Sequence, residues 1–387
     1  MAPRRPSSSS SSSKKKAPGA AGSMLNDAET QFAAGNVDEA IELASRALEA
    51  TGSGGDFELR ALNLLGMLQV ENGEEDEARA YLQRAVVLDE EGMMDEKVGG
   101  GAEKFLFLAQ LSEEGGKDSV RWFERGASVL RRQMQALSDL GPRTSRQQSE
   151  LGEKQQQLGG VLCAVAEVYM TDLSWEDDAE SRCEALITEA MMIAPEAAET
   201  WQTVANVRVS QERTGEARTA LTRSLELWRD LPPEHAGVPE FPTRIALARL
   251  LLETQMEEEA LTVLERLVSE DDESVEAWYL GGWCLYMTGE KQREGAGRNG
   301  GCSEEEEEEE EEWKGTWSTA RKWLARCLKL HAMLEYEDER LGDHAVELFE
   351  NINQELGPMP EGEEEEWEED GEGEGEDDVG EDEEMQD

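Results

Sequence analysis

The stretch Gly35-Asn-Val-Asp-Glu-Ala-Ile-Glu-Leu-Ala-Ser-Arg-Ala-Leu48 places three alanines, Ala40, Ala44 and Ala47, three or four residues apart. That spacing puts the three side chains on one face of a helix. Because alanine is small, a second helix can approach this face closely. Gly35 stands where the preceding helix must turn. The stretch therefore predicts the turn and the second helix of a helix–turn–helix unit.

The same pattern recurs along the chain, which indicates an internal repeat. Seven copies extend over roughly residues 24–335, and two of them have a longer connection between their helices. A final amphipathic stretch, Glu339 to Leu356, predicts a helix that covers the apolar surface of the last copy. The repeated positions are Ala28, Phe32, Gly35, Ala40, Ala44, Ala47 and Leu48; Leu62, Leu65, Gly66, Val70, Gly73, Ala78, Leu82 and Ala85; Phe105, Leu108, Ala109, Gly116, Phe123 and Ala127; Leu162, Val165, Ala166, Tyr169, Cys183, Ile187, Ala190 and Pro195; Trp201, Val204, Ala205, Val209, Ala217, Leu221 and Ser224; Leu247, Ala248, Leu252, Ala260, Leu264 and Leu267; and Trp278, Gly282, Tyr286, Gly289, Ala320, Leu324, Cys327 and Leu328.

These positions resemble the tetratricopeptide repeat, a helix–turn–helix unit of about 34 residues. The resemblance implies an all-α fold, a right-handed superhelical solenoid of about seven repeats with a C-terminal capping helix. The chain departs from the family pattern in its long insertions and in the missing proline of most units.

The whole chain resembles a narrower family, the fungal assembly chaperones dedicated to the large-subunit ribosomal protein L-four. The resemblance is carried by a Ser/Lys-rich start, by Ala34-Gly-Asn-Val-Asp-Glu-Ala40, by Trp201-Gln-Thr-Val-Ala-Asn206, by an interrupted last repeat, and by the acidic residues after Asn353-Gln-Glu-Leu-Gly-Pro358. It implies a chaperone of nucleus and cytoplasm that captures the newly made ribosomal protein through a long basic internal loop. It also implies delivery of that protein to pre-ribosomes. We expect the chain to be a monomer that forms a 1:1 complex with its client.

Composition divides the chain into a solenoid over residues 24–356 and two tails, 1–23 and 357–387, that we expect to be disordered. The first tail carries a charge of +5 and the residues from 361 onward carry −18. Residues 290–315, Gly-rich and then poly-Glu, read as a flexible acidic insertion. Because burying this charge is costly, we expect the insertion to be dispensable for folding.

The net charge favours a cationic partner. The chain has 37 Lys and Arg against 89 Asp and Glu among 387 residues, which gives −52. This charge repels phosphates and anionic membrane surfaces, so we expect neither nucleic acid nor membrane as a direct partner. No secretory signal or membrane-spanning run is present in the sequence, and five scattered cysteines without a CxxC pair are typical of an intracellular protein.

No catalytic, cofactor or metal motif stands out, so we expect neither an enzyme nor a bound cofactor or metal. The three histidines, His235, His331 and His344, read as surface residues beside acids or prolines. Cys163, Cys183 and Cys327 fall on packing positions of the repeat, as do Trp201 and Trp278, and all five are predicted to be core residues.

The first helices of the repeats should line the concave face, where a client would bind. Acids dominate the predicted set and Arg249 is its one base, while Tyr279 and Trp283 are candidate exposed anchors. An acidic face can also be a merely solvated one. The set is Glu29, Phe32, Asn63, Met67, Glu71, Gln110, Glu114, Glu167, Asn206, Ser210, Arg249, Glu253, Tyr279 and Trp283.

The repeat and its charge predict a chaperone that holds a basic, partly unfolded segment in an acidic groove, and the resemblance implies that this segment belongs to a ribosomal protein. A histone chaperone, which also takes basic clients, stays open as an alternative, as does a general cochaperone or scaffold. A cochaperone that grips acidic C-termini is disfavoured because its first helices need Lys, Arg and Asn, and here they carry mostly Glu.

Overall fold

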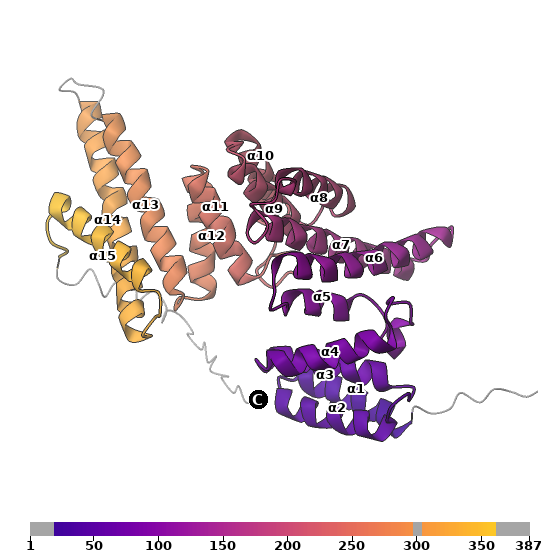
Figure 1. Cartoon of the computed structure of the whole chain (residues 1–387). Coiled ribbons are helices and arrows are strands. Elements are labelled where there is room, and N and C mark those ends of the chain that lie inside the picture. The colour runs from indigo at the N-terminus through magenta and orange to yellow at the C-terminus, as the bar shows by residue number, and fades with distance from the viewer. Residues whose placement is uncertain (1–18, 297–303, 361–387) are drawn as a thin grey trace, which may run out of the picture. The chain divides into compact units, whose positions relative to one another are not determined.

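The computed structural model describes residues 19–296 and 304–360, and within these ranges every regular element is a helix (Figure 1). The chain divides into two compact units between Thr203 and Val204, inside α9 (Ala198–Ser210). Before α9 come α1 (Ala20–Ala33), α2 (Val37–Thr51), α3 (Glu58–Glu71), α4 (Glu75–Leu88), the short 3-10 helix η1 (Glu96–Val98), α5 (Glu103–Gln110), α6 (Gly116–Asp139), α7 (Ser145–Met170) and α8 (Ala179–Ile193). After it come α10 (Thr214–Glu226), α11 (Phe241–Glu253), α12 (Glu257–Glu270), α13 (Val275–Ala296), α14 (Glu304–Met333) and α15 (Glu339–Leu356).

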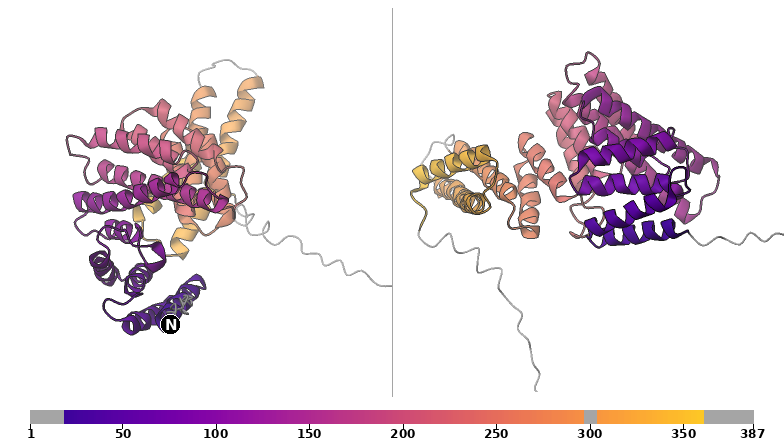
Figure 2. Two further views of the ribbon diagram at one scale, coloured as in Figure 1. Left: turned by 90° about the vertical axis from the view of Figure 1, so that its right-hand side faces the viewer. Right: turned by 60° about the horizontal axis from the view of Figure 1, so that its bottom comes forward.

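Within each unit, helices that follow one another in sequence pack side by side (Figure 1 and Figure 2). The seven predicted helix pairs, α1 and α2 through α13 and α14, are present, and α15 has the bounds predicted for the capping helix. The small residues act as predicted. A β-carbon on Gly66 would lie 2.6 Å from the Leu82 side chain, and one on Gly282 would lie 2.7 Å from Leu324. Glycine at these positions therefore permits the close approach of paired helices.

The turns between paired helices share one geometry at four places. At Gly35, the backbone N–H donates to the carbonyl three residues earlier, and the next N–H donates to the carbonyl five residues before it. This is the Schellman arrangement, which requires a left-handed residue at the helix end. Gly73, Glu212 and Gln255 occupy the same place in their repeats, and the four φ angles lie between 58° and 80°.

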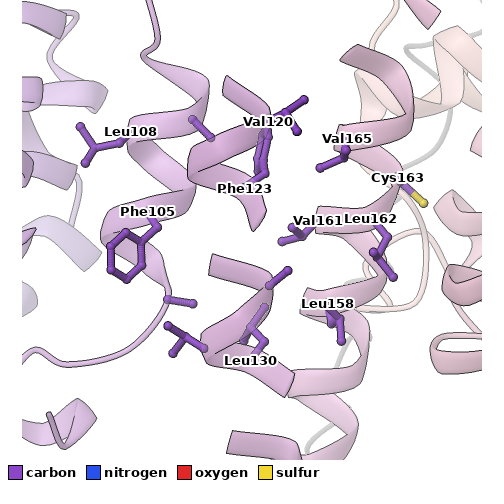
Figure 3. Close-up of a cluster of buried hydrophobic side chains, with 14 of the residues drawn as sticks. Phe105, Leu108, Val120, Phe123, Leu130, Leu158, Val161, Leu162, Cys163 and Val165 are labelled. Atoms are coloured by element: carbon purple, nitrogen blue, oxygen red, sulfur yellow. The ribbon is translucent and has the colours of Figure 1, made fainter. Parts of the chain in front are cut away.

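One hydrophobic core cluster of the first unit lies where α5, α6 and α7 meet (Figure 3). Phe105 of α5, Phe123 of α6, and Leu158 and Leu162 of α7 belong to one hydrophobic cluster, and all four are almost fully buried. The apolar positions recur every three or four residues, so each helix turns one stripe toward its neighbours. Burial of these stripes holds the first helices, and hence the predicted site residues, in fixed register.

Aromatic and sulfur side chains confirm most of the predicted core. The indole N–H of Trp201 donates to the carbonyl of Pro195, and that of Trp278 donates to Asp272, both at 2.8 Å and both across six residues. The two tryptophans therefore occupy one repeat position, although Trp278 is buried and Trp201 is half-buried. Cys163, Cys183, Cys284 and Cys327 are buried, while Cys302 lies outside the described residues.

The predicted insertion differs from the structure at both of its ends. Residues 290–296 continue α13 and residues 304–315 begin α14, so only 297–303 of the expected loop lie outside the described residues. Trp313 falls within the predicted loop and is only 8% exposed, because it packs edge-on against Trp317 with ring centroids 5.2 Å apart. The free energy gained by burying these indole rings exceeds the cost of forming a helix next to the run of glutamates.

The predicted tails fall mostly on residues that the structure does not describe. Residues 1–18 and 361–387 lie outside the described ranges. Residues 20–23, which were expected to belong to the first tail, form the start of α1, and Ala21 and Gly22 are buried there.

Candidate functional site

The first helices bring part of the predicted concave set together in the first unit. Glu29 on α1 and Asn63 and Met67 on α3 line one cavity of about 310 Å³. Spacings of three and four residues place the α3 positions on one face of the helix. Phe32 is half-buried against the core of the first pair, and Glu71, at the end of α3, is exposed.

Bases also line this cavity, which corrects the expectation that Arg249 is the one base on the concave face. The Arg60 guanidinium donates to Glu29 at 2.7 and 3.2 Å and to Asn26 at 2.8 Å. Lys154 of α7 forms a salt bridge with Glu96. Arg60 lies on α3, three residues before Asn63. Lys154 lies on the long N-terminal part of α7, which extends beyond the repeat, so the repeat pattern does not predict which way this side chain points.

The middle of the predicted set is exposed. Gln110 ends α5, Glu114 lies in the turn that follows it, and Glu167 lies near the end of α7. The Thr203 hydroxyl lies 3.4 Å from the Glu167 carboxylate, but burial of that carboxyl group dominates and raises the pKa of Glu167. One turn earlier on α7, burial raises the pKa of the Cys163 thiol to about 11. Although Glu167 is exposed as a whole residue, its carboxyl group is partly covered, and this partial burial disfavours the charged form.

In the second unit, the one base of the predicted set has an acidic partner. Arg249 forms a salt bridge with Glu276, so this base does not stand alone on the surface. Glu253, one turn further along α11, is exposed. Asn206 is half-buried and Ser210 is exposed, with the Ser210 hydroxyl donating to the Val207 carbonyl at 2.8 Å.

Tyr279 and Trp283 are not exposed anchors, contrary to the prediction. The Tyr279 hydroxyl lies 2.6 Å from Nδ1 of His344 on α15. The His344 ring also meets Trp283 edge-on at 5.6 Å. Burial raises the pKa of Tyr279 to about 12. A helix that follows the last pair packs against the first helix of that pair, so α15 takes the surface that a client was expected to use.

Contrary to the prediction, not all three histidines are surface residues. His344 is half-buried in the aromatic cluster rather than a surface residue beside acids. His331 lies 3.1 Å from the Asp338 carbonyl through Nε2 and packs against the Tyr336 ring. His235 is exposed, as predicted.

A buried ion pair beside the cavity was missed from the sequence. Lys104 and Asp89 are 1% and 5% exposed, and the Lys104 amine lies 2.9 Å from the Asp89 carboxylate and 3.0 Å from the Gly101 carbonyl. Burial lowers the pKa of Lys104, while Asp89 opposes that shift. Lys104 precedes Leu108 and Leu111 by four and seven residues. That helical spacing could have marked Lys104 as buried and in need of a partner.

In the described ranges, no group of three or more His, Cys, Asp or Glu side chains lies together as a metal site would require. Among the same residues, no helix has the length and apolar composition of a membrane span.

Comparison with known proteins identifies the repeat. A family model described as "Tetratricopeptide repeat" matches residues 20–91, and a second with the same description matches residues 245–296. The first match covers the helices from α1 to α4, and the second covers most of α11 together with α12 and α13. These matches confirm the predicted repeat fold.

Two curated proteins, both named "Probable assembly chaperone of rpl4", are similar over most of the chain. The one from Emericella nidulans is 45% identical over 337 residues, which cover 86% of this chain and 82% of the relative. The one from Schizosaccharomyces pombe is 32% identical over 317 residues, which cover 82% and 87%. A solved structure, "Assembly Chaperone of RpL4 (Acl4) (Residues 1-338)", matches with a TM-score of 0.67 at 58% identity, over 71% of this chain and 99% of that one.

Proposed function

Because this chain belongs to the family of assembly chaperones of rpl4, we propose that it is the dedicated chaperone of that large-subunit ribosomal protein. The observation that carries the proposal is the 45% identity to the Emericella nidulans protein across 86% of this chain. A relation of this extent includes both structural units and not the repeat alone.

The client's basic internal loop binds the exposed acids on the first-helix face. Glu71, Glu114 and Glu253 are exposed there, while Glu29 is already paired with Arg60. Acids of this kind steer a cationic chain and fix its register rather than supplying most of the affinity. Tyr279 and Trp283 pack against α15 and serve the fold of the last repeat, so the client contacts lie elsewhere.

The chaperone holds one client molecule, keeps it soluble and delivers it to pre-ribosomes, and it acts in cytoplasm and nucleus. A basic segment that is not yet folded can attach to any nucleic acid. Shielding by an acidic repeat protein prevents this until delivery. The protein acts by binding, not by catalysis, and it does not bind nucleic acid or membrane directly.

Purification from the native host, followed by reconstitution, tests the proposal. The full chain should co-purify with rpl4, and the two recombinant proteins should form a 1:1 complex by light scattering. Excess H3–H4 histone should not displace rpl4 from the complex. Co-purification with histones instead, or displacement at equal concentration, would assign the chain to the histone chaperones.

A further inference from the structure

The cavity in the first unit is lined by both apolar and polar residues. Leu64, Met67 and Phe107 are among the apolar ones, and Asn63, Glu96 and Glu103 contribute polar groups. Its volume of about 310 Å³ is at the small end of ligand pockets. The space therefore suits one large side chain rather than a folded element.

One of the acidic residues that line the cavity has no salt-bridge partner in the described part of the chain. Glu29 is paired with Arg60, Glu96 with Lys154, and the amine of Lys104 with Asp89. Among the residues that the structure describes, Glu103 forms no salt bridge, and it is exposed at the start of α5. A single cation entering the cavity would neutralise this remaining charge.

Asn63 offers an acceptor that the fold leaves unused. Its Nδ2 donates to the Gly99 carbonyl at 2.5 Å, and this bond fixes the amide orientation because the carbonyl can only accept. The Oδ1 atom of the same amide is buried and accepts no hydrogen bond from the described residues. The oxygen has almost no exposed surface, so an incoming group reaches it only when lining side chains shift, and a donor placed there then offsets the cost of the unpaired acceptor.

These features together favour an arginine side chain. Its guanidinium presents several N–H donors in a plane, so it can donate to Asn63 Oδ1 and to a carboxylate at the same time. Its flat face can lie on an aromatic ring such as Phe107, and its stem suits Met67. Lysine carries the same charge on a compact group, and a neutral side chain leaves Glu103 unpaired.

We infer that this cavity is a subsite for one arginine of the bound client, recognised through Asn63 and Glu103. The inference rests on the proposed function, since it assigns a place in the groove to one residue type of the client. It also explains why Arg60 and Lys154 line the cavity: each holds a neighbouring carboxylate in place and so limits the site to one incoming charge.

The first experiment uses the full chain and a small probe. N-acetyl-arginine-N-methylamide, titrated into isotope-labelled protein, should shift backbone NMR signals of α3 and residues 99–107. The blocked lysine should bind several-fold more weakly and the blocked citrulline not measurably. Equal responses to arginine and citrulline, or arginine shifts that avoid these residues, would overturn the inference.

The second experiment uses recombinant rpl4 and isothermal titration. Glu103→Gln removes only the charge, and Asn63→Ala removes the acceptor; loss of one hydrogen bond to a charged group predicts a Kd roughly tenfold weaker for each. Glu124→Gln, an exposed change on α6 outside the cavity, is the matched control and should bind like the wild type.

The outcomes separate this inference from the proposed function. If the wild type binds rpl4 and both cavity variants bind equally well, the arginine subsite is refuted while the chaperone function stands. If the wild type does not bind rpl4, the function itself fails. Thermal unfolding of each variant reports on folding, and Glu103→Gln, at an exposed position, should unfold at the wild-type temperature.

Discussion

Four turns between paired helices share one backbone geometry but not one residue type. Gly35 and Gly73 occupy the left-handed position in the first two repeats, whereas Glu212 and Gln255 occupy it in later ones. A residue with a β-carbon is strained in this conformation by about 1–2 kcal/mol. Two repeats therefore carry a local cost that two others avoid.

Exchange of residues at this position should change stability in opposite directions. Glu212→Gly should raise the free energy of unfolding by about 0.5–1 kcal/mol, because relief of strain exceeds the entropy that glycine loses on folding. Gly73→Ala should lower it by about 1 kcal/mol. Urea unfolding of both variants measures the two effects. A Glu212→Gly protein less stable than wild type would show that the Glu212 side chain contributes a contact worth more than the strain.

Glu167 carries a second residue-level cost, which depends on pH. Because burial raises its pKa in the folded state, Glu167 favours folding below its unfolded pKa and loses that contribution as pH rises through the folded value. Above the folded pKa the carboxylate is charged in both states, and the fold bears the cost of partly covering it.

Replacement by the neutral amide should reveal this cost. Glu167→Gln should raise the melting temperature at pH 7, and the gain should vanish near pH 4, where the wild-type carboxyl is protonated. Glu71→Gln, on an exposed first-helix position, is the matched control and should show little change. A gain that is the same at both pH values would show that shape or hydrogen bonding, not charge, separates the two side chains.

At the scale of elements, the long pair α13 and α14 shows where composition and packing disagree. The run of glutamates before Trp313 favours an extended, solvated chain. Trp317 nevertheless donates its indole N–H to the Tyr286 carbonyl at 3.0 Å and stacks on the Tyr286 ring. The Arg293 guanidinium lies 5.5 Å from the ring centres of both Trp313 and Trp317. The Arg293–Trp313 contact ties the two helices together within the predicted loop, and the Tyr286–Trp317 contacts do so just beside it.

The boundary of the dispensable part follows from these contacts. Replacing residues 290–315 with a Gly/Ser linker should lower the melting temperature clearly, because loss of the buried Trp313 alone costs on the order of 3 kcal/mol. Replacing only residues 297–303 with Gly/Ser of equal length should leave it unchanged. Calorimetry of the two variants measures both melting temperatures. An unchanged melting temperature in the longer replacement would show that residues 290–315 form an insertion that does not contribute to stability.

The sequence predicts the helix pairs well because small residues such as Gly66 and Ala78 must recur wherever helices approach closely. It predicts α15 for a similar reason, since Leu341, Ala345 and Leu348 form one apolar face. It does not predict which cations reach the concave face. Arg60 and Lys154 come from different helices, and their pairing depends on how far each helix extends beyond the repeat.

The site residues were also harder to predict where a neighbouring element covers them. The repeat pattern places Tyr279 and Trp283 on the first-helix face, but only the structure shows His344 of α15 against both rings. The pattern describes one repeat at a time. Contacts that the next helix makes with that repeat therefore lie beyond it.

At the scale of the whole molecule, the acidic residues behind the net charge of −52 are of two kinds. Those of residues 361–387 follow one another in sequence without a base, and those of the first helices are fixed by the fold. A run of acids with few apolar residues attracts any cation, and its effect is screened within about 8 Å at physiological salt. Fixed charges can also set register.

The two kinds of acid should therefore act on different rate constants. Deleting residues 361–387 should slow association with rpl4 at low salt, have little effect at about 150 mM salt, and leave dissociation unchanged. Reversing Glu71 and Glu253 to Lys should speed dissociation and weaken the complex by roughly tenfold or more. Stopped-flow kinetics at two salt concentrations measures both.

Reversal of Glu49 and Glu265, which are exposed on second helices, changes the net charge equally and is the control for the groove variant. It should dissociate like the wild type. If the tail deletion alone abolished binding while the groove variant bound normally, the fold would be only a carrier for an acidic tail.

Contacts between helices one or two places apart in sequence have a mechanical consequence. In residues 19–296 and 304–360 most contacts between helices join such neighbours, so tension applied at the ends reaches one helix pair at a time. A pair of about 34 residues, drawn out at about 3.4 Å per residue, adds ~100 Å of contour length. The pair α13 and α14, whose tryptophans lock two long helices together, should give the longest step and yield at the highest force.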